Sequence, residues 1–300
     1  MKFRIDNIEY NLKEKQDLSW LKKYGTVFSC IDQTGSGCIL FGVKSKDKKL
    51  FIKIAGAKTM YAEVSQKESV NFLKKAVENY KHIKHPNLIR LVDSFEKDEL
   101  HVAMFEWVDG ECLFDHWNFE MYKQDSSIVT PAAKFNALDI NKKLSVIEKL
   151  FTFFIATKNA GFVAVDFYDS SIIYNFETDE VYFCDIDLFR KVPTYNDLGE
   201  GYFGTRRLKA PEENELGACI DEKTNMFTLG AIIFDMLSKK DTDNIKERYL
   251  KGYFIPCSFE NFTLSKQSYD VLLKATALNR NERFDSIEDF YSAWKNSLAQ

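Results

Sequence analysis

The pattern of hydrophobic residues changes once along the chain, after Asp109-Gly110, and this change limits the possible folds most strongly. Before it, short β-like runs predict five strands, at 26–31, 38–43, 50–54, 88–95 and 101–108, with one helix over 65–84. After it, longer periods predict helices at 144–160, 227–237, 268–278 and 287–298, with β runs at 171–174 and 181–184. This order predicts an α+β protein of two lobes, with a five-stranded N-lobe containing one helix and a mainly helical C-lobe.

Composition and charge narrow the class of protein. The 300 residues carry a net charge of -4 and a pI of about 5.7, which does not favour sequence-independent binding to nucleic acid. No apolar run reaches the ~18 residues of a membrane-spanning helix. The N-terminus lacks the apolar region of a signal peptide, and no two of the six cysteines form a C-x-x-C pair. We therefore expect a cytoplasmic protein without membrane contact, with free thiols in a reducing compartment.

Lys53 and a glycine-rich turn upstream of it are candidates for phosphate binding. Lys53 interrupts the apolar strand 50–54, and a lysine buried there without a partner is unfavourable. An alternative is a lysine on an edge strand that faces solvent. The turn at 33–37 contains Gly35 and Gly37, and backbone N–H groups in such a turn can approach phosphates that a nearby cation pairs with.

Two aspartates follow apolar runs in the second part of the chain. Asp166 comes after 162–165, and Asp185 lies nineteen residues later, at the end of the strand 181–184. Two such carboxylates with a β-hairpin between them suggest that one holds a metal and the other orients a hydroxyl.

With these residues in place, the sequence from about 25 to 295 resembles a protein kinase, and within that superfamily it is most similar to bacterial serine/threonine kinase-like proteins. Lys53, Asp166 and Asp185 occupy the positions of the lysine of V-A-I-K and the aspartates of H-R-D and D-F-G. Further similar segments, in family order, are Lys84–Leu91, Met104–Glu111, Phe203–Glu212, Ile220–Gly230 and Asn279–Arg283. The resemblance divides the chain into an N-terminal extension (1–24), an N-lobe (25–108) and a C-lobe (109–300) of one kinase-like domain.

The resemblance implies that Lys53 binds the α- and β-phosphates of ATP, that Asp185 binds Mg²⁺ or Mn²⁺, and that Asp166 accepts the hydroxyl proton of the substrate. The glycine-rich loop aligns as 32–37, where Gly37 is the one family glycine retained and Gly35 is extra. A plain hairpin turn is the alternative for this loop.

Several residues differ from the family pattern around Asp166. Ser171 replaces the asparagine that binds a second metal ion, and a hydroxyl is a weaker neutral ligand than an amide. Tyr168 replaces a lysine, which removes a charge near the transferred phosphoryl group but leaves one hydrogen-bond donor. Ala164 and Val165 replace histidine and arginine, so activation by phosphorylation of the activation loop is not expected.

Three further positions near the D-F-G aspartate and in the activation segment have implied roles. Asp187 is either a second metal ligand or a solvent-facing turn residue, and we favour the turn. Thr205 is expected to form a hydrogen bond with Asp166, and Glu212 is expected to pair with Arg283. Asn225 replaces the aspartate that orders the catalytic loop, so this loop is expected to be less rigid.

The resemblance also implies a binding site for adenine and ribose. The residues expected there are the backbone of Glu106 and Val108, Phe105 as gatekeeper, Ile39 and Ile173 on either side of the base, and Glu111 at the ribose. Phe51 replaces a small residue and either stacks on adenine, excludes it or is an ordinary core residue. Glu68 is the preferred carboxylate partner of Lys53, since Glu78 falls off the expected helix face.

Three functions fit this pattern. The first is an ATP- and Mg²⁺-dependent Ser/Thr protein kinase, favoured by the retained Lys53, Asp166 and Asp185. The second is a pseudokinase that binds nucleotide or a protein partner without transfer, favoured by the departures and the sparse glycines. The third is a small-molecule kinase, favoured by Phe51 and Asp187.

Overall fold

The structure is a computed structural model that describes residues 1–239 and 242–299. The chain divides into two compact units. The first comprises Met1–His82 and Leu88–Asp109, and the second comprises Ile83–Asn87 and Gly110–Gln300. Each unit has its own hydrophobic core, and each is described separately below.

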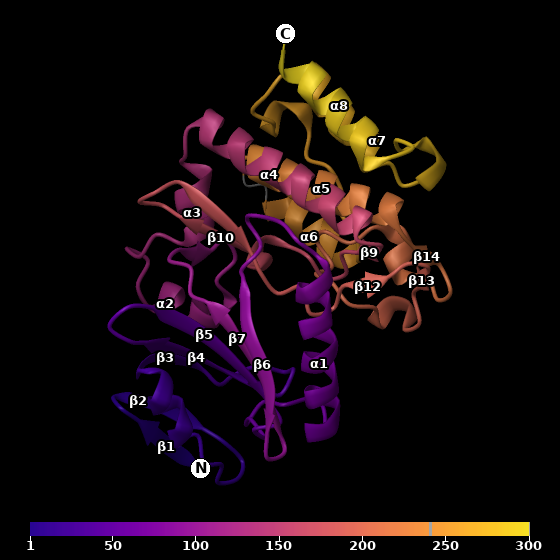
Figure 1. Ribbon diagram of the computed structural model, residues 1–300. Helices are drawn as coiled ribbons and strands as arrows, with labels where there is room; N and C mark the ends of the chain where they lie inside the picture. The colour runs from indigo at the N-terminus through magenta and orange to yellow at the C-terminus, as the bar shows by residue number, and fades with distance from the viewer. Residues whose placement is uncertain (240–241, 300) are drawn as a thin grey trace. The chain divides into compact units, whose positions relative to one another are not determined.

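The first unit is built on a five-stranded antiparallel sheet with one long helix, as predicted. The strands lie in the order β3-β4-β5-β7-β6. Their bounds are Thr26–Ile31 (β3), Cys38–Lys44 (β4), Lys49–Ala55 (β5), Leu91–Lys97 (β6) and Leu100–Glu106 (β7). The helix α1 (Gln66–His82) lies beside this sheet (Figure 1). The predicted strand at 88–95 begins only at Leu91, because the chain from Pro86 to Arg90 is a turn and an irregular segment.

The register assigns the side chains of the sheet to two faces. Directly opposed residues of antiparallel strands share a face. Ile39 is opposite Ile54, and Lys53 is opposite Leu40 and Ala103. Ile39 and Ile54 therefore lie on one face, and Leu40 and Lys53 lie on the other.

Helix α1 covers the face that carries Lys53. Its buried positions, Ser69, Leu73, Ala76, Val77, Asn79 and Tyr80, recur at helical spacing. The ring of Tyr80 contacts the buried ring of Phe105 edge to face at 4.7 Å between centroids. The opposite face of the sheet is therefore left for another part of the chain.

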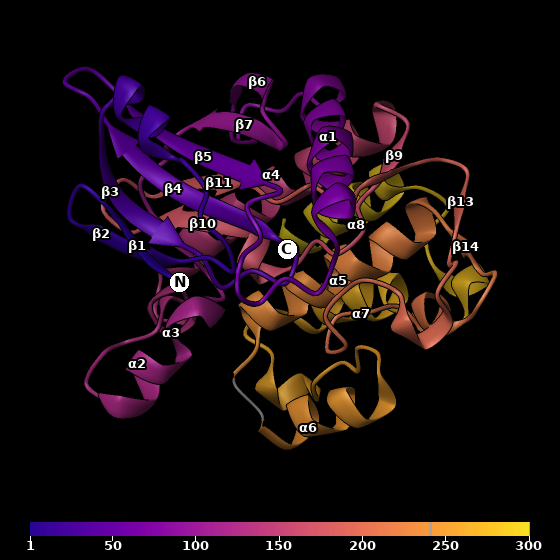
Figure 2. The same ribbon diagram turned by 90° about the horizontal axis from the view of Figure 1, so that it is seen from below.

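The N-terminal residues 1–24 cover that opposite face and complete the core of the first unit. They form a hairpin of β1 (Lys2–Ile5) and β2 (Ile8–Asn11), followed by the 3-10 helix η1 (Ser19–Tyr24) (Figure 2). Leu12 and Leu21 are fully buried, and the ring of Tyr10 contacts Phe41 of β4 at 5.5 Å. Residues 1–24 are thus an integral part of the first unit.

The second unit is mainly helical and is built around a nearly fully buried helix α5 (Glu222–Leu237). Three further helices, α4 (Ile140–Asn159), α7 (Lys266–Ala275) and α8 (Ile287–Leu298), pack against it and one another (Figure 1). The segment 118–139 forms the short helices α2 (Phe119–Gln124) and α3 (Pro131–Asn136). Helix α6 (Thr242–Lys251) was not predicted, because its sequence is mostly polar.

Short strands and 3-10 turns position the loops of the second unit. The strand pairs and triplets are β8 (Glu111–Cys112) with β10 (Ile172–Asn175) and β11 (Glu180–Phe183), β9 (Phe162–Val163) with β12 (Arg190–Lys191), and β13 (Thr194–Tyr195) with β14 (Cys219–Ile220). The 3-10 helices are η2 (His116–Asn118), η3 (Asp169–Ser171), η4 (Gly199–Gly201), η5 (Pro211–Asn214), η6 (Phe259–Asn261) and η7 (Arg280–Glu282). In the described part of the chain, no helix combines the length and the apolar character that crossing a membrane requires. All six cysteines are free thiols.

Candidate active site

Lys53 lies on the central strand of the sheet. β5 has β4 on one side and β7 on the other, and the Lys53 side chain is half-buried on the face that α1 covers. The edge-strand alternative is therefore wrong. A cation in the middle of a sheet is held firmly in place, which suits a residue that must bind a phosphate.

Glu68 is not placed to pair with Lys53. Its Oε2 accepts a hydrogen bond from the Ser65 backbone N–H at 2.9 Å, and Ser65 Oγ accepts one from the Glu68 N–H at 3.3 Å. This reciprocal pair is a capping box at the start of α1, and it lowers the pKa of the exposed Glu68 carboxyl. Glu78, the other acidic residue of α1, is also exposed and pairs with Lys81 at 2.8 Å. The buried face of α1 therefore carries no carboxylate.

The glycine-rich turn is packed against its own lobe. Gly37 has a φ of +73°, and a Cβ there would lie 3.1 Å from Ser69 Oγ of α1. Gly35 lies against the side chain of Glu63, whose backbone N–H donates to the Gly35 carbonyl at 2.9 Å. The hydroxyl of Thr34 bonds to the carbonyl of Cys38 across the turn. The turn is therefore held by contacts with α1 and with Glu63.

The predicted adenine-binding residues separate onto the two faces of the sheet. Phe51 is half-buried on the face of Lys53, opposite the buried Phe105, with ring centroids 6.1 Å apart. Ile39 is fully buried in the core beneath residues 1–24. The expected contact of Ile39 with adenine does not fit this position, and the half-buried Leu40 takes its place on the face of Lys53.

The segment after β7 is held by side-chain contacts within the first unit. Asp109 accepts hydrogen bonds from Lys49 Nζ at 2.7 Å and from Trp107 Nε1 at 2.9 Å. Glu106 pairs with Arg90 through its carboxylate and donates its backbone N–H to the Arg90 carbonyl at 2.9 Å. Val108 is half-buried between these anchored residues.

Glu111 and Ile173, predicted to contact the nucleotide, lie together at the start of the second unit. Both carboxylate oxygens of Glu111 accept from Lys134 Nζ of α3, at 2.8 and 2.9 Å. A Cβ on Gly110 would lie 2.8 Å from Ile173 Cγ2, so the backbone there approaches Ile173 closely. Recognition of a ribose by Glu111 would compete with its ion pair to Lys134.

The backbone that leads to Asp166 is held by Asn225 of α5. The side-chain amide of Asn225 donates to the Ala164 carbonyl at 2.8 Å, and its Oδ1 accepts from the Ala164 N–H at 2.7 Å. Both bonds are buried, so this loop is anchored more firmly than the loss of the family aspartate led us to expect.

A cluster of aromatic rings brings Asp166 and Asp185 to the same region. Phe167 follows Asp166, Phe183 lies two residues before Asp185, and their ring centroids are 6.0 Å apart. Phe153 of α4 contacts both rings, at 5.3 and 4.7 Å. These three rings are buried and hold the two loops against α4.

Asp185 influences the titration of Asp166. Burial and the neighbouring Asp185 raise the pKa of Asp166 to about 7, and Lys209 partly opposes this rise. Both aspartates have positive φ, 59° and 56°. A carboxyl group whose pKa lies near neutrality is suited to accepting a proton.

Ser171 and Asp185 fit a site for a divalent cation. Ser171 Oγ is buried and has no hydrogen-bond partner among the described residues. The Ser171 carbonyl accepts from the N–H of Cys184, the residue before Asp185, at 2.9 Å. Oxygen donors suit Mg²⁺ or Mn²⁺, which commonly bind through one or two carboxylates and the phosphates of a substrate.

No group of three or more His, Cys, Asp or Glu that could hold a metal occurs within residues 1–239 and 242–299. The half-buried Asp187 stays a candidate ligand.

Tyr168 and Thr205 differ in how well they match their predicted roles. Tyr168 is half-buried, contacts the ring of Phe114 at 6.4 Å, and has a pKa raised by burial, so the phenol is uncharged at neutral pH. The backbone carbonyl of Thr205 accepts from Leu208 at 2.9 Å. Where the chain is described, its hydroxyl does not form the expected hydrogen bond with Asp166.

Arg207 of the activation segment, which the sequence analysis missed, forms buried ion pairs with two other elements. It binds Asp169 of η3 and, at 2.8 Å, Asp235 of α5. Asp235 also pairs with Arg248 of α6 at 2.6 Å. These contacts order the segment without a phosphate group, in agreement with the loss of the family arginine before Asp166.

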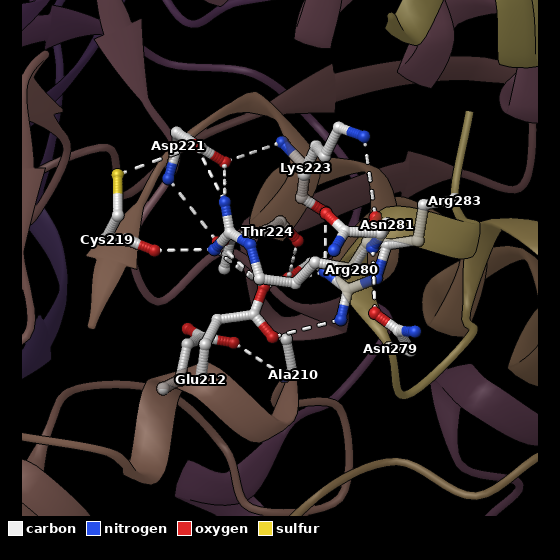
Figure 3. Close-up of polar contacts among 12 residues, drawn as sticks. Ala210, Glu212, Cys219, Asp221, Lys223, Thr224, Asn279, Arg280, Asn281 and Arg283 are labelled. Atoms are coloured by element: carbon white, nitrogen blue, oxygen red, sulfur yellow. Dashed lines mark hydrogen bonds and ion pairs between the residues drawn. The ribbon is translucent and has the colours of Figure 1, made fainter. Parts of the chain in front are cut away.

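Glu212 pairs with Arg283, as predicted. The distances are 2.6 and 3.0 Å, and both side chains are buried (Figure 3). Arg280 adds a bidentate pair with Asp221 at 2.8 and 2.7 Å and reaches Glu212 at 3.4 Å. The end of the activation segment is therefore tied to both α5 and η7.

The two units correspond to the two lobes of a kinase fold. The first is a five-stranded sheet with one helix, and the second is mainly helical. A family model described as the protein kinase domain matches residues 24–251, and the chain belongs to this family. The chain is also similar to calcium-dependent protein kinase 5 of Plasmodium falciparum (isolate 3D7), with 21% identity over 234 residues. The match covers 75% of this chain and 38% of the relative, so the chain spans well under half the length of that protein. The predicted kinase resemblance is confirmed, and a bacterial origin stays a prediction.

Proposed function

We propose that this chain is an ATP-dependent protein kinase that phosphorylates serine or threonine. The observation that carries the proposal is the group formed by Asp166, Ser171 and Asp185, which the aromatic cluster and one backbone hydrogen bond hold together. Membership of the protein kinase family supports the reaction class.

Each residue has a role in the proposed reaction. The substrate hydroxyl oxygen forms a bond to the γ-phosphorus of ATP, the bond from that phosphorus to the β–γ bridging oxygen breaks, and ADP leaves with the electron pair. Asp166 orients the hydroxyl and accepts its proton. Asp185 and Ser171 would hold Mg²⁺ or Mn²⁺, which neutralises phosphate charge when bound. Lys53 binds the α- and β-phosphates.

Nucleotide binding without transfer is a second candidate function. One feature of the first unit favours it: the glycine-rich turn packs on Ser69 and Glu63.

The test is transfer of label from γ-labelled ATP, with Mg²⁺ or Mn²⁺, to the chain itself, a basic protein and a panel of small alcohols. We expect Asp166→Asn to lower the rate at least 100-fold, since it removes the proton acceptor, and to leave the melting temperature within a few degrees. Thermal stabilisation by nucleotide without transfer would favour the second function. Faster transfer to a small alcohol than to protein would contradict the proposal.

A further inference from the structure

Lys209 is a buried lysine in the second unit. It is 4% exposed and lies directly before Ala210 in the activation segment. Its Nζ donates a hydrogen bond to the Tyr202 carbonyl and, within the described residues, forms no ion pair closer than 4 Å. An ammonium group has three donors, and its burial is unfavourable unless nearby polar or charged groups compensate for it.

The contacts of Lys209 place its charge beside the loop that carries Asp166. Tyr202, whose carbonyl holds Nζ, packs in one cluster with Val163 and Val165, and Val165 directly precedes Asp166. Gly204 lies against the stem of the lysine, since a Cβ there would be 3.2 Å from Lys209 Cε. At the other end, the Lys209 carbonyl accepts from the Phe254 N–H at 2.9 Å. The Lys209 side chain therefore lies along the activation segment, and its ammonium group is held by the residue that packs on Val165.

The electrostatics agree with this placement from both sides. Lys209 lowers the pKa of Asp166. Burial lowers the pKa of Lys209, Glu213 and then Asp166 raise it, and Arg206 lowers it. The buried Glu213, which accepts from the Ala210 N–H at 2.7 Å, also faces this ammonium. Asp166, Asp185 and the phosphates of ATP are all negative, and at neutral pH Tyr168 contributes no charge. A cation near these groups reduces their repulsion.

We propose that Lys209 supplies, from the activation segment, the positive charge beside Asp166 that the catalytic loop lacks at Tyr168. Lys209 is a positioning residue: because it is buried, it acts on Asp166 and the bound phosphates through its field and does not touch the substrate. The proposal rests on the phosphoryl transfer proposed above.

The test moves a lysine charge from the activation segment to the catalytic loop. We expect Lys209→Met to lower kcat about 100-fold, the effect of losing one preorganised electrostatic group, with little change in the acceptor KM. Adding Tyr168→Lys to Lys209→Met returns the charge to the catalytic loop and should restore kcat at least tenfold. A purely structural lysine would not be rescued by a lysine on another segment. Lys251→Met, at an exposed lysine of the same unit, is the matched control.

Two results would overturn the proposal: a Lys209→Met variant that keeps more than a third of wild-type kcat, or a double variant no faster than the single one. If Lys209→Met does not fold, Lys209→Arg and Lys209→Gln replace it, and only the arginine variant should keep at least a tenth of the wild-type rate.

Failure of the proposed kinase function would be recognised separately, because wild type would then transfer label to none of the acceptors. In that case, titration of each protein with Mg²⁺ and ATP tests the proposed role of Lys209. Lys209→Met should weaken binding at least fivefold and the double variant should recover it, whereas equal affinity in all three proteins would reject the proposed role of Lys209.

Discussion

At the scale of single residues, the structure shows that two departures from the family pattern have local compensation. Asn225 meets both the N–H and the carbonyl of Ala164, which a carboxylate could not do, because an ionised aspartate only accepts hydrogen bonds. Arg207 binds Asp169 and Asp235, so the activation segment is anchored without a phosphate group. The family aspartate is replaced by Asn225, and the family arginine before Asp166 is replaced by Val165. Asn225 itself and Arg207 provide the contacts that hold the catalytic loop and the activation segment.

The Asn225 anchor predicts that restoring the family aspartate is harmful. Asn225→Asp leaves the buried Ala164 carbonyl facing a carboxylate, so we expect a loss of about 2 kcal/mol in the free energy of unfolding. Denaturant titration at neutral pH measures it, with Asn281→Asp, at an exposed asparagine, as control. Equal stability of wild type and Asn225→Asp would show that the loop rearranges around the new residue.

At the scale of elements, helix α1 is stabilised by its own N-terminal cap. Its acidic residues form contacts within the helix and at its start. The capping box between Ser65 and Glu68 satisfies backbone N–H groups that the first turn leaves open. The face of α1 that meets the sheet is apolar apart from Ser69 and Asn79. The helix is therefore a packing element of the first unit, and its acidic residues are turned away from the sheet.

This arrangement predicts that substitution of Ser65 lowers stability and that substitution of Glu68 leaves the affinity for ATP nearly unchanged. Ser65→Ala should lower the free energy of unfolding by about 1 kcal/mol, because it removes the capping hydroxyl. Glu68→Gln keeps an acceptor for the Ser65 N–H, and we expect it to change the affinity for ATP less than twofold. Thermal melts and nucleotide titrations measure the two effects, with Glu78→Gln as control. A tenfold loss of ATP affinity in Glu68→Gln would support the original pairing with Lys53.

At the scale of the whole molecule, the chain contains two units with separate cores, and residues 1–24 are needed for one of them. Ile5, Tyr10, Leu12, Leu18 and Leu21 are buried against the sheet face opposite α1. Without them, the apolar side chains of β4 and β5 on that face would be exposed to water.

We therefore expect Tyr10→Ala to destabilise the protein. Tyr10 is 4% exposed and contacts Phe3 at 5.7 Å and Phe41 at 5.5 Å, and removal of a buried aromatic ring costs about 3–5 kcal/mol. Tyr61→Ala, at a tyrosine that is 61% exposed, should change stability by less than about 0.5 kcal/mol. Denaturant unfolding of both variants measures this. If both lose equally little stability, residues 1–24 do not belong to the folded core.

Much of the architecture could be predicted because its signals are local. The five strands, the helix over 65–84 and the helices at 144–160, 227–237 and 287–298 all follow from hydrophobic periodicity, and the structure contains each of them within a few residues. The hairpin at 1–11 and helix α6 were missed, since four-residue strands and a mostly polar helix leave little periodicity to detect.

The sequence by itself determined the family, the order of the elements and the placement of Lys53, Asp166, Ser171 and Asp185 in their motifs, because spacing along the chain carries that information. Only the tertiary structure decided that Ile39 faces the core, that Glu68 caps its own helix and that Arg207 pairs with Asp169 and Asp235. These outcomes depend on strand register and on contacts between residues far apart in sequence. A one-residue change in register moves a side chain to the other face, and no local pattern specifies which distant carboxylate a lysine or arginine will meet.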